Sequence, residues 1–116
     1  MKLLTKEIIE KLPKLGTQDG KASEEVSVIV KFFDPTGSWT WFAIEGQPVY
    51  DEQQKEVDFE FFGYVRGFEG ELGYFMLNEL LHAKDGLTGL KAVPIERDFD
   101  FGFDHTLKEV MNGRVI

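Results

Sequence analysis

Alternating apolar and polar residues predict a β-hairpin in the first half of the chain. Residues 26–33 (VSVIVKFF) and 38–45 (SWTWFAIE) are rich in β-branched and aromatic residues, and residues 34–37 (DPTG) have the composition of a turn. Pro35 suits position i+1 of a type I turn, and Gly37 suits the left-handed position that often follows. The pattern therefore pairs residues 26–33 with residues 38–45.

The second strand of this hairpin is apolar on both faces. Period-two geometry separates its side chains into two sets, Trp39, Trp41 and Ala43 against Ser38, Thr40, Phe42 and Ile44. Such a strand is either covered on both sides or keeps one aromatic face for a partner. The chain has only two tryptophans, and they belong either to the core or to an exposed platform.

A third strand is expected over residues 59–68 (FEFFGYVRGF), where Gly63 and Gly67 share a face with Phe59, Phe61 and Val65. Glycines in a strand mark a bulge or the close approach of a large neighbour, and the tryptophans are the obvious neighbours. The charged stretch before this strand, residues 45–58, predicts an exposed excursion.

Short helices are expected near both ends of the chain. Thr5 suits the N-cap of a helix over residues 5–12, followed by a polar loop over residues 13–25. Thr106 suits the N-cap of a last helix, LKEVM.

Between these ends, the period of the pattern changes twice. Leucines at helical spacing predict a helix over residues 77–83 that Gly86 would stop. Strict alternation then predicts a half-buried strand with Arg97, Phe99, Phe101 and Phe103 on one face and Glu96, Asp98, Asp100 and Gly102 on the other.

The order of these elements indicates an α+β fold. We expect one domain over residues 1–116, with the remaining strands and helices in residues 58–112. Its antiparallel sheet would have four to five strands, and the short helices would pack on one face of that sheet. A chain of 116 residues with 42% hydrophobic residues is long enough for one core.

The charge of the chain restricts its partners. Thirteen basic against 21 acidic residues give a formal net charge of -8, which disfavours direct binding to nucleic acid and favours a protein partner. The same charge would attract basic proteins or imitate DNA. No apolar run is long enough for a signal peptide or a membrane helix, so a cytoplasmic protein without membrane contact is expected. The oligomeric state is left open.

The sequence offers no catalytic constellation and no cofactor motif. Without cysteine, thiol nucleophiles and thiolate metal sites are excluded. Glu69 and Glu71, or the acids at 96, 98 and 100, have the chemistry to hold a divalent cation, but an alternating acidic strand is usually a solvated face. His82 and His105 do not have metal-ligand spacing. A non-enzymatic protein that needs no metal is the expectation.

Arg97 is unusual because it shares a predicted face with phenylalanines. A guanidinium on such a face needs a carboxylate partner, and Glu45, Glu69 or Glu71 would serve. The pair is either a buried structural ion pair or a clamp for an anion beside the tryptophans.

Three blocks resemble one known family over nearly the whole chain: VKFFDPTGSWTWFAIE, FFGYVRGFEGELGYFMLNEL and VPIERDFDF. The family is an uncharacterised domain of unknown function common on bacterial plasmids, conjugative elements and phages. The matching positions are Phe32, Phe33, Trp39, Trp41, Glu45, Phe62, Gly63, Glu69, Glu71, Leu72, Gly73, Tyr74, Phe75, Glu79, Leu80, Pro94, Ile95, Glu96, Arg97 and Asp98. The DPTG turn and Met76 depart from the pattern of the family. The resemblance implies no catalytic residue.

Three functions are compatible with these observations. The first is a non-enzymatic interaction protein that serves a mobile element as an accessory factor. The second is a DNA mimic that inhibits a host restriction or CRISPR nuclease, and the third is a small-molecule or catalytic pocket of aromatic residues and Arg97. The expected binding surface consists of Trp39, Trp41, Glu45, Glu69, Glu71, Tyr74, Glu96, Arg97 and Asp98.

Overall fold

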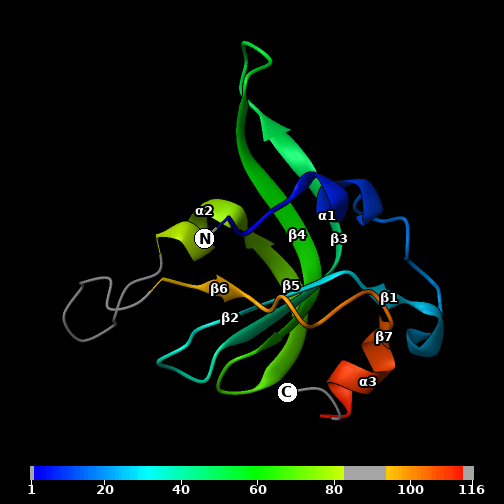
Figure 1. The fold of residues 1–116 in the computed structure, drawn as a ribbon. Helices are drawn as coiled ribbons and strands as arrows, with labels where there is room; N and C mark the ends of the chain where they lie inside the picture. Colours follow the sequence, from blue (N-terminus) through cyan, green and yellow to red (C-terminus); the bar gives the residue numbers. More distant parts are fainter. Residues whose placement is uncertain (1, 83–93, 114–116) are drawn as a thin grey trace.

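A five-stranded antiparallel sheet in the order β5-β4-β3-β2-β6 dominates the computed structural model, which describes residues 2–82 and 94–113 (Figure 1). Its strands are β2 (Val30–Phe33), β3 (Thr40–Tyr50), β4 (Glu56–Arg66), β5 (Gly70–Met76) and β6 (Glu96–Arg97). A second sheet pairs β1 (Ser27–Val28) with β7 (His105–Thr106). The helices are α1 (Lys6–Lys11), α2 (Leu77–Leu81) and α3 (Leu107–Met111), with a 3-10 turn at Ser23–Glu25. The predicted α+β class with an antiparallel sheet is confirmed.

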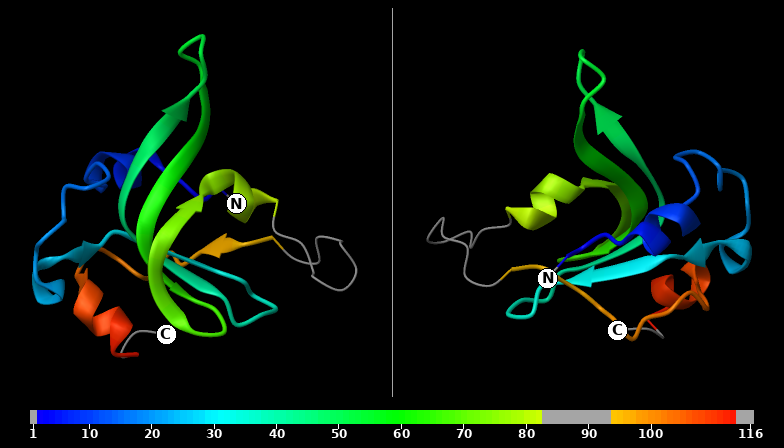
Figure 2. Two further views of the ribbon diagram at one scale, coloured as in Figure 1. Left: turned by 180° about the vertical axis from the view of Figure 1, so that it is seen from behind. Right: turned by 45° about the horizontal axis from the view of Figure 1, so that its top comes forward.

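The large sheet has a separate apolar core on each face. The first core joins Phe32, Phe59, Phe61 and Phe75 to residues of α1 and α2, including Ile8 and Leu80. The second joins Phe42, Ile44 and Phe101 to Leu107 and Val110 of α3. The expectation that all helices cover one face is therefore wrong. The β1–β7 ribbon places α3 on the other face, where the backbone N–H of Leu107 donates to Val26 O at 2.8 Å (Figure 2).

The predicted hairpin is confirmed only from Val30 onward. β2 and β3 pair with Phe33 opposite Thr40 and Val30 opposite Ala43, so residues 38 and 39 precede the strand instead of beginning it. Residues 26–33 are not one strand, because the chain leaves the large sheet at Ile29 and Val28 pairs with His105 instead. This switch buries Val28 in the α3-side core.

The charged stretch before the third strand is exposed and projects from the sheet, as expected, but it does so as two paired strands. β3 and β4 continue as paired strands to Tyr50 and from Glu56, and together form the projecting arm in Figure 1. The tip is closed by Asp51, whose Oδ1 accepts from the N–H groups of Gln53 at 2.9 Å and Lys55 at 3.0 Å. Cross-strand hydrogen bonds here outweigh the weak strand propensity of the charged residues.

The alternating pattern of residues 96–103 does not produce a strand of that length. Only Glu96–Arg97 pairs with β2. Beyond it, Asp98 Oδ1 accepts from Asp100 N at 2.9 Å, and Gly102 has a φ of +71°, so the chain turns. Phe101 then enters the α3-side core, whereas Phe103 packs against the α1-side core.

The helix caps follow the local sequence. Thr5 Oγ1 accepts from Ile8 N at 3.2 Å, and Thr106 Oγ1 accepts from Glu109 N at 3.3 Å, as predicted for N-caps. Helix α2 ends at Leu81, and the stop expected at Gly86 lies outside the described residues.

The loop after α1 is attached to the sheet by a buried carboxylate. Glu45 is 2% exposed and follows a bulge in β3. Its two oxygens accept backbone N–H bonds from Gly16 at 2.9 Å and Gln18 at 2.6 Å. A buried carboxylate with two such donors ties loop and sheet together.

We predict that Glu45→Ala lowers the free energy of unfolding by about 3 kcal/mol, because two backbone donors lose a charged acceptor. Urea denaturation at neutral pH measures the change. Glu24→Ala, at an exposed position, is the control and should change stability by less than about 0.5 kcal/mol. Equal stability of both variants would contradict the anchoring role of Glu45.

Candidate functional site

Two β-turns bring three aromatic side chains together at one end of the sheet. The β2–β3 and β4–β5 turns lie side by side in Figures 1 and 2. The ring centroids of Trp39 and Trp41 are 6.1 Å apart with near-parallel planes. Phe68, in the other turn, stands at 80° to Trp39 with centroids 5.8 Å apart. We call Trp39, Trp41 and Phe68 the aromatic tip.

Gly67 explains how the indole of Trp39 is seated. A Cβ at Gly67 would collide with three atoms of the six-membered ring of Trp39, so the ring lies flat over the backbone of this glycine. The predicted approach of a tryptophan is thus confirmed at Gly67. At Gly63 it is wrong, because a Cβ there would meet the backbone carbonyl of Phe42.

The two tryptophans have different environments. Trp41 is half-buried and packs against the α1-side core. Trp39 is 38% exposed and Phe68 is 97% exposed. The question of core or platform therefore has a separate answer for each tryptophan, since Trp41 supports the core and Trp39 faces outward with Phe68.

A hollow of about 240 Å³ opens beside the aromatic tip and is lined by Trp39, Val65, Phe68, Glu69 and Glu71. Val65 of β4 lies opposite Trp41 of β3 on one side and opposite Glu71 of β5 on the other. The side chains of these three residues therefore form a row across three neighbouring strands. Within residues 2–82 and 94–113, neither the Glu69 nor the Glu71 carboxylate takes part in an ion pair. The hollow thus combines aromatic walls with two acidic groups.

The remaining expected surface residues lie elsewhere. Tyr74 is 66% exposed but belongs to the opposite face, where its ring contacts Phe62 at 4.8 Å. Glu45 does not belong to any surface, because it is buried as the loop anchor. Glu96, Arg97 and Asp98 lie at β6, at the other edge of the sheet.

Arg97 does not have the partners expected from the sequence. Its Nη1 donates to the carbonyls of Lys2 at 2.7 Å and Leu3 at 3.3 Å, and its guanidinium lies 4.9 Å from the ring of Phe99. Glu45, Glu69 and Glu71 are engaged elsewhere or lie across the sheet, so the predicted ion pair with them is wrong.

Arg97 is also separate from the tryptophans. Its register partner in β2 is Phe32, and Phe32 in turn pairs with Trp41. The hollows that Arg97 lines, of about 180 and 290 Å³, contain neither tryptophan. The neighbouring Asp98 forms an ion pair with Lys31 of β2 at 3.3 Å. This ion pair attaches the segment after β6 to β2.

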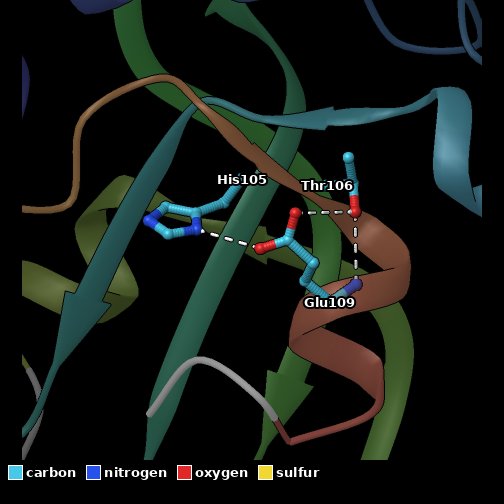
Figure 3. A network of polar contacts seen from close by, with 3 residues as sticks. All are labelled: His105, Thr106 and Glu109. Atoms are coloured by element: carbon cyan, nitrogen blue, oxygen red, sulfur yellow. Dashed lines mark hydrogen bonds and ion pairs between the residues drawn. The ribbon is translucent and has the colours of Figure 1, made fainter.

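A small polar network lies at the start of α3 (Figure 3). His105 Nδ1 is 3.2 Å from Glu109 Oε2, and this hydrogen bond is the main reason why the pKa of Glu109 lies below its ordinary value.

In the part of the chain that the structure describes, no group of three or more His, Asp or Glu side chains is placed to hold a metal ion. Nor does any described helix have the length and apolarity to cross a membrane.

The sequence reasoning missed Phe68 and Val65 as members of the site. The expected strand over residues 59–68 includes Phe68, whereas β4 ends at Arg66 and Phe68 lies in the turn that follows. The available signal was the context of Phe68, a large aromatic residue between glycines 67 and 70, which is typical of a turn that displays its side chain.

Over residues 3–113 the chain matches a family described as protein of unknown function (DUF2958), and it belongs to that family. The expected membership in a family with a domain of unknown function is confirmed; the association with plasmids and phages stays a prediction. Searches of curated proteins and of solved structures found no match.

We predict that Gly67→Ala displaces the indole of Trp39, because the new methyl group occupies the position of the ring. Tryptophan fluorescence should shift to longer wavelength, and the loss of stability should stay near about 1 kcal/mol because an exposed ring can move aside. Gly73→Ala is the matched control, since open space surrounds its Cβ position. An unchanged emission spectrum in Gly67→Ala would contradict the flat seating of Trp39.

We predict that Glu109 stabilises the fold at neutral pH and loses this effect in acid. A depressed folded-state pKa gives stability above the unfolded-state pKa, which disappears as pH falls through the folded-state pKa. The difference in unfolding free energy between the protein and Glu109→Gln should therefore be present near neutral pH and disappear in acid, as pH falls through the lowered folded-state pKa of Glu109. Denaturation curves across this range measure it, and a difference independent of pH would refute the assignment.

Proposed function

We propose that the chain is a non-enzymatic protein-binding module whose contact surface is the aromatic tip. The observation that carries the proposal is the joint exposure of Trp39 and Phe68 beside a hollow. Interface cores are enriched in aromatic residues, and hot spots are often tryptophans that lie in preformed pockets. Trp39 and Phe68, which two turns bring together at the edge of this hollow, fit this description.

The support for the rings favours binding without rearrangement. Trp39 is seated on Gly67 and stacked near Trp41, and Trp41 packs against the core. An ordered contact surface loses little conformational entropy when a partner binds. The tip is thus better suited to a stable docking contact than to a loop that folds on binding.

The biological role that we propose is that of an accessory factor of a bacterial mobile element. The proposal rests on the resemblance of the three sequence blocks and on the net charge of -8. An acidic surface favours a basic partner protein by long-range attraction.

A DNA mimic that inhibits a basic nuclease is the second candidate, and the same acidic charge supports it. Such a mimic would protect DNA from cleavage in a restriction assay. The third candidate, a pocket shared by the tryptophans and Arg97, lacks support because different hollows hold these residues.

We predict that the double variant Trp39→Ala, Phe68→Ala loses its partner in affinity capture from host cells. Truncation of two central aromatic residues typically costs several kcal/mol of binding energy, so the captured amount should fall by about a hundredfold. Tyr50→Ala, which removes an exposed aromatic side chain at the far tip of the β3–β4 arm, is the matched control. The proposal fails if both variants capture the same proteins in the same amounts.

A further inference from the structure

We propose that the hollow beside Trp39 binds the side chain of an arginine in a basic segment of the partner protein. This inference rests on the proposed function and specifies the chemistry of the same site. It follows from three features of the hollow: an outward-facing indole, a second ring as a wall, and two carboxylates.

The first feature is the orientation of the indole. One face of the Trp39 ring is covered by Gly67, and the side chain is still 38% exposed. Part of this ring is therefore accessible from the hollow, beside the stacked ring of Trp41. Tryptophan offers the strongest attraction for a cation over its face, and guanidinium groups stack there more often than ammonium groups.

The second feature is the wall that Phe68 provides. Its plane stands at 80° to that of Trp39, so the two rings enclose a corner rather than a flat surface. A planar guanidinium on the indole would have the ring of Phe68 beside it. Partial removal from water strengthens a cation–π contact.

The third feature is the negative charge at the rim. Glu69 and Glu71 line the hollow together with Trp39, and no ion pair of the described chain includes them. A carboxylate can accept two parallel N–H bonds from one guanidinium. A guanidinium can therefore stack on the aromatic rings and donate hydrogen bonds to the carboxylates at the same time. An apolar side chain would contact the rings but would give the carboxylates no hydrogen-bond donor.

The chemistry of the site is less suited to other cations. A divalent metal ion prefers several oxygen ligands, and this hollow offers two carboxylates and otherwise apolar or aromatic walls. A lysine ammonium lacks the planar fork that matches a ring and a carboxylate at once. Arginine is accordingly the occupant that uses every wall of the hollow.

The test uses the full chain and the peptide acetyl-Gly-Arg-Gly-Arg-Gly-amide at low ionic strength. Because Trp39 and Trp41 are the only tryptophans, a saturable change in fluorescence reports binding at the tip itself. We expect such a change, and a peptide with citrulline, which is isosteric but neutral, should produce none. The lysine peptide should bind more weakly than the arginine peptide.

Two charge-matched variants separate the site from the general field of an acidic protein. Glu69→Gln, Glu71→Gln should raise the dissociation constant by about tenfold. Glu24→Gln, Glu25→Gln removes the same charge at exposed positions outside the hollow and should change it by less than about twofold. Thermal unfolding of both variants checks that they remain folded.

Equal weakening by the two variants would overturn the inference, because net charge alone would then explain binding. Equal binding of the citrulline peptide, or an absence of any fluorescence change, would overturn it as well. If the tip-dependent partner is still captured from cells in either case, the proposed function stands and only the arginine assignment falls. Peptide binding without any captured partner would support the cation site and refute the proposed function.

Discussion

The pairing of β3 with β4 is the interaction on which the rest of the structure depends. These two strands form the centre of the sheet, and alternate residues of the same ribbon supply both cores, with Phe61 on one face and Phe42 on the other. Gly63 makes the close approach of the strands possible, because any side chain there would collide with the backbone of Phe42. The bulge that follows Ala43 turns Glu45 toward the loop that it anchors.

The candidate site is a consequence of the same ribbon. The two turns that flank it meet at the end opposite the projecting arm, and this meeting places Phe68 against Trp39. Trp41 connects the exposed ring to the α1-side core, so the aromatic tip is supported by the residues that stabilise the fold. Burial of exposed aromatic surface on binding is favourable. Because Trp39 is already supported by Trp41 and Gly67, little conformational entropy is lost when it is buried. In the complex that we propose, Glu69 and Glu71 would add selectivity, since they repel acidic surfaces and attract basic ones.

The local parts of the fold were predictable from the sequence. Thr5 and Thr106 cap their helices because the hydroxyl reaches an N–H only three residues away. The β2–β3 turn likewise has local determinants, since Asp34 Oδ1 accepts from Thr36 N at 3.0 Å. The left-handed conformation expected at Gly37 is wrong, because this glycine does not have a positive φ. The sequence also indicated that an aromatic and acidic surface would include Trp39, Glu69 and Glu71.

The distant contacts were decided by the tertiary structure. Alternation predicted one face for Phe99, Phe101 and Phe103. In the structure Phe101 lies in the α3-side core, Phe103 packs against the α1-side core and Phe99 is exposed. Burial of two rings on opposite faces outweighs a regular strand. Glu45 was expected on the binding surface, but in the structure the loop after α1 covers it and donates two backbone N–H bonds to its carboxylate.

The sequence by itself determined the central parts of β2, β3 and β4, where helices begin and the acidic net charge of -8, because short-range geometry and composition control these properties. Only the tertiary structure decided that Trp39 and Phe68 meet while Arg97 lies across the sheet. Contacts between residues far apart in the chain depend on strand order and on the packing of both faces, and neither can be read from local periodicity.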